Sequence, residues 1–130
     1  MKTFYIGVPP KDTWGIVVIY DYDRHDKEEL EAIMDSFGLN EYRIIEAMNV
    51  LKRKNSGMTI SRQDLRMSAV FISDATSIDE WCSTAIHEFI HVADAILDYY
   101  GEDWHGESSA YLVGYLTKEL VRNIEIPCFY

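Results

Sequence analysis

The longest amphipathic pattern in the sequence lies between residues 77 and 101, and it constrains the fold more than any other feature. Its apolar residues recur at intervals of three and four, which is the spacing of one helical face. They are Trp81, Ala85, Ile86, Phe89, Ile90, Ala93, Ile96 and Leu97. Ser77 followed by Glu80 is typical of a helix N-terminus, and Gly101 is typical of a helix end. The sequence therefore predicts a long central helix here.

Short β-branched runs predict the strands of a small sheet. The stronger runs cover residues 15–20 and 68–73, and both are bounded by residues that favour turns. Residues 3–8 are a further, shorter candidate. Residues 58–63 give a mixed signal, and no element is assigned to them.

Three further helices complete the outline. The first is expected to start at Asp26 as N-cap, with Glu29 three positions later, and to stop at Gly38. The second is expected to start near Asn40, and the last to span residues 107–122. The apolar face expected for the second helix consists of Tyr42, Ile45, Met48, Val50 and Leu51. We expect an α+β fold in which a small sheet packs on helices, and the strand order is not readable from the sequence.

Length and charge limit the function classes. At about 150 residues per domain, the 130 residues predict one domain over residues 1–130. The formal net charge is −10, so a nucleic acid or an anionic membrane is not an expected partner. The most basic run, residues 52–54 (Lys-Arg-Lys), is interpreted as a helix end followed by a loop.

The sequence gives no sign of membrane insertion or export. No apolar run approaches the roughly 18 residues that span a bilayer, and the first residues do not form a secretory signal. The two cysteines, Cys82 and Cys128, form no paired motif, which favours a reducing compartment. We therefore expect a cytoplasmic protein.

The central helix carries the motif HExxH at residues 87–91. Residues four apart lie one turn apart on one helical face, so the imidazoles of His87 and His91 can converge on a metal ion. Two imidazoles and a carboxylate suit Zn²⁺, which lowers the pKa of a bound water to about 7. Glu88 is placed to accept the proton of that water as general base.

A catalytic zinc has three protein ligands and an open position, so a third ligand is needed. Glu107 ranks first because a helix returning antiparallel carries its first-turn carboxylate back towards the metal helix. His105 in the connecting loop ranks second. Asp94 ranks third, because it is better placed to accept a hydrogen bond from a histidine than to bind the metal.

These motifs resemble those of the gluzincin metallopeptidases, in which HExxH on one helix is followed by a Glu on the next. Residues 68–77, the HExxH segment, Gly106-Glu107 and residues 110–115 look like small zincin-like proteins of gut bacteria and their phages. The resemblance covers residues 68–120. It implies a zincin-like fold with His87, His91 and Glu107 as zinc ligands and Glu88 as general base.

The sequence departs from that family in one respect and from a related branch in another. Larger gluzincins have a second subdomain that supplies a transition-state stabiliser, and the chain has no room for one. The preferred candidate for that role is Tyr111, and His105 and Tyr99 are alternatives. The longer metzincin motif is absent, because Asp94 stands at its glycine position.

The resemblance implies a zinc-dependent metallopeptidase that hydrolyses peptide bonds in a peptide or protein substrate. In such enzymes an edge strand beside the metal helix pairs with the substrate, and residues 70–72 are the candidate here. The alternative is a catalytically silent zincin-fold binding module, of phage or mobile-element type, acting on a host partner. A third possibility is a structural domain with an accidental HExxH, and the oligomeric state is left open.

Overall fold

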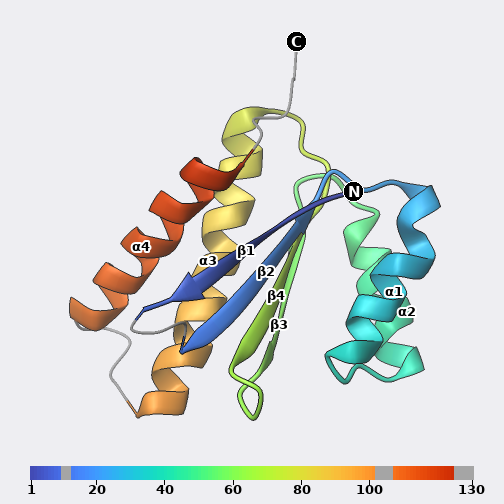
Figure 1. Ribbon diagram of the computed structural model, residues 1–130. Helices are drawn as coiled ribbons and strands as arrows, with labels where there is room; N and C mark the ends of the chain where they lie inside the picture. Colours follow the sequence, from blue (N-terminus) through green and yellow to red (C-terminus); the bar gives the residue numbers. More distant parts are fainter. Residues whose placement is uncertain (10–12, 102–106, 125–130) are drawn as a thin grey trace.

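The protein contains one four-stranded mixed sheet. The computed structural model describes residues 1–9, 13–101 and 107–124 (Figure 1). The strands are β1 (Lys2–Val8), β2 (Trp14–Tyr20), β3 (Gly57–Arg62) and β4 (Met67–Ile72), in the spatial order β1-β2-β4-β3. β2 and β4 are parallel, and the two outer strands run antiparallel to their neighbours. The expected α+β fold with a small sheet is confirmed.

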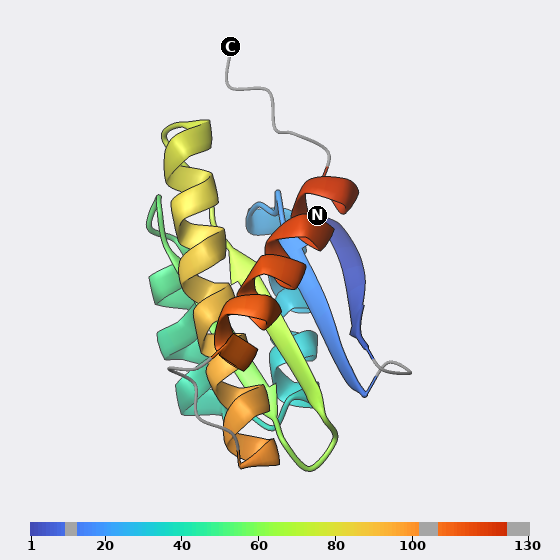
Figure 2. The ribbon, with the colours of Figure 1, turned by 90° about the vertical axis from the view of Figure 1, so that its left-hand side faces the viewer.

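Helices cover both faces of this sheet. α1 (Lys27–Ser36) and α2 (Glu41–Leu51) lie on one face, and α3 (Ile78–Tyr100) and α4 (Glu107–Asn123) lie on the other (Figure 1). Figure 2 shows α3 and α4 side by side across the sheet. None of the described helices is both long and apolar enough to cross a membrane.

The two faces of the sheet form two hydrophobic cores. Ile16 and Val18 of β2 face α3 and α4, whereas Ile19 faces α1 and α2. β2 is therefore buried on both faces, which explains its nearly continuous apolar sequence. The buried indole of Trp14 donates to Ser68 Oγ at 3.0 Å, so its polar atom is satisfied inside the core.

The long central helix begins and ends where the sequence indicates. Ser77 Oγ accepts a hydrogen bond from the backbone N–H of Glu80 at 3.2 Å. Gly101 closes the helix in the left-handed conformation with φ of 70°, which glycine adopts without steric strain. Asn40 caps α2 in the same way as Ser77, accepting from Arg43 N at 2.9 Å.

Two local predictions are wrong, and a third is confirmed only in part. The sequence outline has no strand at β3, because its apolar-polar alternation covers only residues 58–61 and all of its side chains are half-buried. Asp26 is the N-cap residue of α1, as expected, but its side chain makes no capping hydrogen bond to that helix; its carboxylate accepts from Asp23 N at 3.0 Å, within a short 3₁₀ turn. α2 buries Ala47 and Leu51 rather than the whole expected face. Tyr42, Ile45 and Val50 of that face are exposed.

Candidate metal centre

Two imidazoles lie face to edge on the outer side of α3. The side chains of His87 and His91 are exposed, and their Nε2 atoms lie 3.3 Å apart, with the ring planes at 77°. Two nitrogens bound to zinc at 2.0–2.1 Å with tetrahedral geometry lie about 3.3–3.4 Å apart. The separation of the two nitrogens therefore suits two ligands of one zinc ion.

Glu88 lies beside the histidine pair but is buried, with 5% of its surface exposed. Its Oε1 accepts a hydrogen bond from Thr59 Oγ1 at 2.8 Å, and its Oε2 lies 3.9 Å from His87 Nε2. The ligand atoms of His87, Glu88 and His91 all lie within 4.8 Å of one another. The hydroxyl of Thr59 thus holds one carboxylate oxygen and leaves the other directed at the histidine pair.

β3 approaches α3 closely enough to require a glycine. A Cβ atom on Gly57 would lie 2.9 Å from Glu88 Cγ, 2.9 Å from Thr84 Cγ2 and 3.0 Å from the carbonyl oxygen of Phe71. Thr59, two residues later, is also 3.2 Å from the carbonyl oxygen of Glu88. Gly57 therefore permits the close packing that brings Thr59 to the buried carboxylate.

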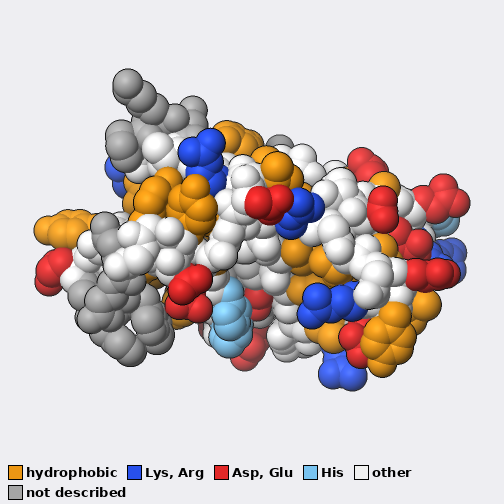
Figure 3. Space-filling view, turned by 90° about the horizontal axis from the view of Figure 1, so that it is seen from below, with side chains coloured by type: hydrophobic (Ala, Val, Ile, Leu, Met, Phe, Trp, Pro, Cys, Tyr) orange, Lys and Arg blue, Asp and Glu red, His pale blue; other side chains and the backbone are white. Residues whose placement is uncertain are grey.

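A shallow cavity of about 350 Å³ adjoins the cluster. Its wall includes Ser56, Gly57, Thr84, His87 and Glu88, so it lies between the start of β3 and α3. Figure 3 shows histidine side chains open at the surface, with acidic side chains beside them. Because His87 and His91 are exposed and the cavity is open, the cluster is accessible to a metal ion and to a ligand from outside.

The strand next to the cluster is β3, and this corrects one expectation. β4, which contains residues 70–72, is paired with β2 on one side and with β3 on the other. Its backbone is therefore not free to pair with a substrate. β3 is an outer strand of the sheet, and among the described residues no strand pairs with its other edge.

The structure brings together three of the expected site residues. His87, Glu88 and His91 form the cluster, whereas Glu107 and Asp94 are exposed and lie outside it. Glu107 is the first residue of α4, as expected, and its role as third ligand stays a prediction. His105 lies outside the described residues.

Of the candidate stabilisers, Tyr111 and Tyr99 are within the described residues, and His105 is outside them. Tyr111 is 75% exposed on α4. The ring of Tyr99 packs edge-on against Trp14, with ring centroids 5.7 Å apart, near the end of α3. Eight residues separate Tyr99 from His91, which is about 12 Å along a helix. Tyr111 thus remains a predicted catalytic residue that the contacts of the described residues leave without support.

Sequence reasoning missed Thr59 and Gly57. The signal that points to them is the turn at residues 55–57, followed by the β-branched pair Thr59 and Ile60 and then by the strand at residues 68–73. Two extended segments so close in sequence favour an antiparallel hairpin. Which side of that hairpin meets the metal helix depends on the strand order.

Comparison of the chain with family models, with curated proteins and with solved structures finds no match. The residues of the site are therefore the only basis for a function of this chain.

Proposed function

We propose that the chain is a small zinc-dependent metallopeptidase, in which His87 and His91 bind the metal and Glu88 is the general base. The observation that carries the proposal is the 3.3 Å separation of the two Nε2 atoms, which is that of two tetrahedral zinc ligands. Glu107, the first residue of α4, is the proposed third ligand, because a carboxylate completes a zinc site beside two imidazoles and the resemblance to gluzincins implies one at this position.

The chemistry divides between the metal and the chain. Bound zinc supplies a Lewis acid that lowers the pKa of a water to about 7. Glu88 accepts the proton of the attacking water and passes it to the leaving amine of the peptide. The hydrogen bond from Thr59 fixes the carboxylate, so that Glu88 Oε2 stays near the imidazoles throughout.

The free edge of β3 is the proposed site for the peptide. An extended substrate adds to such an edge by main-chain hydrogen bonds, and β3 lies against the helix that carries the cluster. A peptide paired with β3 therefore passes close to Glu88, since Thr59 of the same strand touches that carboxylate.

A second candidate is a zincin-like binding module without catalysis. The observation that favours it is the position of the tyrosines: Tyr111 is largely exposed, and the ring of Tyr99 is packed against Trp14. Neither hydroxyl is positioned to donate a hydrogen bond to an oxyanion at the cluster. In this alternative, the metal and the edge of β3 bind a host partner but do not cleave it.

The decisive experiment compares wild type with Glu88→Gln after zinc reconstitution. Elemental analysis measures bound zinc, and mass spectrometry of a digested peptide library measures cleavage. Glu88→Gln is expected to keep the metal and lose hydrolysis, because the amide cannot accept the proton. Glu29→Gln, at an exposed position of α1 on the other face of the sheet, is the matched control and is expected to cleave like wild type.

Each other result has a defined meaning. Cleavage by Glu88→Gln at the wild-type rate removes Glu88 from the mechanism. A full equivalent of zinc without cleavage of any peptide favours the binding module. Less than about a tenth of an equivalent of zinc, when His91→Ala gives the same value, excludes a metal centre. Glu107→Gln is expected to weaken zinc binding about tenfold or more, and Asp94→Asn is expected to weaken it less.

A further inference from the structure

A second cavity lies on the opposite side of the sheet from the metal cluster. It has a volume of about 270 Å³ and opens between the start of α1, the end of α2 and the residues after β4. Its apolar wall includes Leu30, Met48 and Leu51, of which the two leucines are buried in the core. This size is near the lower end of the range for pockets that hold small molecules.

The rim of this cavity concentrates positive charge in an acidic protein. Five of the 12 Lys and Arg residues of the chain line it, together with two acidic residues, Asp23 and Asp74. The five are Arg24, Lys27, Lys52, Arg53 and Lys54. The basic run interpreted from the sequence as a helix end is thus brought together with two cations from the start of α1.

Most of these cations have no internal counter-ion. Lys27 pairs with Glu31 at 3.6 Å, whereas the other four make no ion pair with a residue in the described part of the chain. Asp23 already accepts a hydrogen bond at Oδ1 from His25 N, at 2.7 Å. The rim therefore has an excess of positive charge that the described residues do not neutralise.

A buried donor in the wall gives an independent indication of a ligand. The hydroxyl of Tyr22 is buried and has no hydrogen-bond partner among the described residues. Burial, and after it the nearby carboxylate of Asp74, raises the pKa of Tyr22, so the phenol keeps its proton. An unsatisfied buried donor is unfavourable, and an acceptor oxygen on a ligand removes that penalty.

We propose that this cavity binds a small organic anion. Its apolar body lies against Leu30, Met48 and Leu51, and its phosphate or carboxylate group lies among the rim cations, within reach of the Tyr22 hydroxyl. The concave apolar wall favours a small molecule. A nucleic acid is disfavoured, because its phosphates would be repelled by the acidic residues on the rest of the surface.

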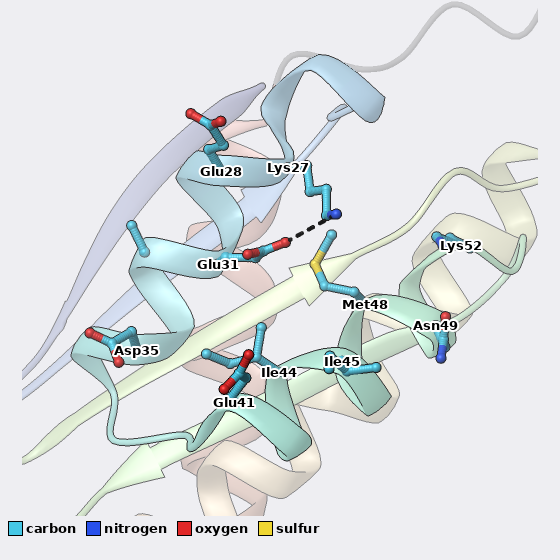
Figure 4. A pocket seen from close by; sticks show the side chains of 11 residues that line it. Lys27, Glu28, Glu31, Asp35, Glu41, Ile44, Ile45, Met48, Asn49 and Lys52 are labelled. Atoms are coloured by element: carbon cyan, nitrogen blue, oxygen red, sulfur yellow. Dashed lines mark ion pairs between the residues drawn. The ribbon is translucent and has the colours of Figure 1, made fainter.

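The neighbouring groove limits where the anionic group can lie. That groove lies between α1 and α2 and shares Lys27, Met48 and Lys52 with the cavity, and four acidic side chains are among the other residues that line it (Figure 4). They are Glu28, Glu31, Asp35 and Glu41. Repulsion by these carboxylates confines an anion to the end where the rim cations gather.

The test uses the whole chain without added metal and 1-naphthyl phosphate as the probe. Calorimetry gives the affinity, and methyl signals of Leu30, Met48 and Leu51 locate the site by NMR. Binding is expected to be saturable and to weaken as ionic strength rises, because the Debye length falls from about 30 Å at 0.01 M to about 8 Å at 0.15 M. Inorganic phosphate and 1-naphthol are each expected to bind about tenfold or more weakly.

Variants separate the cavity from general charge effects. Arg53→Glu is expected to weaken binding about tenfold or more, whereas Arg43→Glu, an exposed arginine at the other end of α2, is expected to change it little. Tyr22→Phe is expected to weaken binding severalfold while the chain stays folded.

Three results would overturn the proposal. The first is that 1-naphthyl phosphate shows no saturable binding up to about 10 mM, a concentration at which even weak ligands bind. The second is that 1-naphthol or inorganic phosphate binds as tightly as 1-naphthyl phosphate. The third is that Arg53→Glu and Arg43→Glu lose the same amount of affinity. Because metal is left out and Glu88 is not involved, failure here does not bear on the metallopeptidase proposal.

Discussion

Gly57 is the most direct point at which to test the packing of β3 on α3. In Gly57→Ala, the new methyl group would meet Glu88 Cγ and Thr84 Cγ2 at 2.9 Å and the carbonyl oxygen of Phe71 at 3.0 Å. Carbon atoms in contact prefer separations of about 3.5–4.0 Å. The side chains can shift, but the Phe71 oxygen belongs to the backbone of β4, so β3 itself has to move.

The expected loss of stability follows from these distances. Overpacking by one methyl group costs about 1–3 kcal/mol. The lower entropy of alanine in the unfolded chain offsets about 0.4–1 kcal/mol of this. The net loss is then about 1–2 kcal/mol. At about 2.1 cal/mol/K per residue, a chain of 130 residues loses about 4–7 °C in Tm.

Thermal unfolding followed by circular dichroism measures this loss, and Gly114→Ala is the matched control. Gly114 lies within α4, and a Cβ atom there meets nothing within 4 Å. Alanine is better than glycine in a helix by about 0.5–1 kcal/mol, so Gly114→Ala is expected to raise Tm by about 2–4 °C. The same chemical change thus has opposite signs at the two positions.

The reasoning is refuted if Gly57→Ala is as stable as wild type while Gly114→Ala gains stability as expected. β3 would then lie further from α3 than the contacts of Gly57 indicate. The hydrogen bond from Thr59 to Glu88 would lose its structural basis at the same time, because it depends on the same close approach.

Three further predictions concern the cluster and the N-terminus. Thr59→Val is expected to lower the free energy of unfolding, measured by urea titration, by about 1–3 kcal/mol, because Glu88 stays buried and loses its hydrogen-bond donor. Thr59→Ser keeps a hydroxyl and is expected to keep most of the wild-type stability. Equal losses in the two variants would contradict the role of the hydroxyl. Zinc at 100 times its Kd is expected to raise the free energy of unfolding by about 2.7 kcal/mol, which corresponds to about 10 °C in Tm. An equal gain in His91→Ala would show that the metal binds elsewhere. The backbone N–H of Asp23, and less strongly the N-terminal ammonium, lower the pKa of Asp26 from 3.8, so its stabilising effect is present above pH 4 or so and is lost as pH falls below that value. In urea titrations at decreasing pH, Asp26→Asn should flatten this fall, and parallel curves for Asp26→Asn and wild type would contradict the role of Asp26.

Helix α3 is predictable from the sequence because its signals are local. The cap at Ser77, the stop at Gly101 and the apolar spacing between them all act within a few residues. The approach of His87 to His91 follows from the same spacing, since a helical turn places residues four apart on one face. These features need no knowledge of the rest of the fold.

The position of Glu88 is not predictable in this way, because it depends on contacts distant in sequence. Its partner Thr59 is 29 positions away and lies on a short strand whose side chains are all half-buried, so the sequence does not show which face of the strand meets α3. Whether β3 or β4 lies at the edge depends on the strand order, which local patterns do not encode. Asp26 shows the same limit on a smaller scale, because Asp23 and the N-terminal ammonium compete for its carboxylate.

The parallel pairing of β2 with β4 has a consequence for the order of folding. β1–β2 and β3–β4 are each formed by strands adjacent in sequence, whereas the pairing between them closes over residues 21–66. Long loops close later than short ones, because more chain entropy is lost before contacts form. His87 and His91 meet as soon as one helical turn exists. Under the proposed function, zinc is therefore expected to bind them before the sheet is complete, and refolding with and without zinc tests that order.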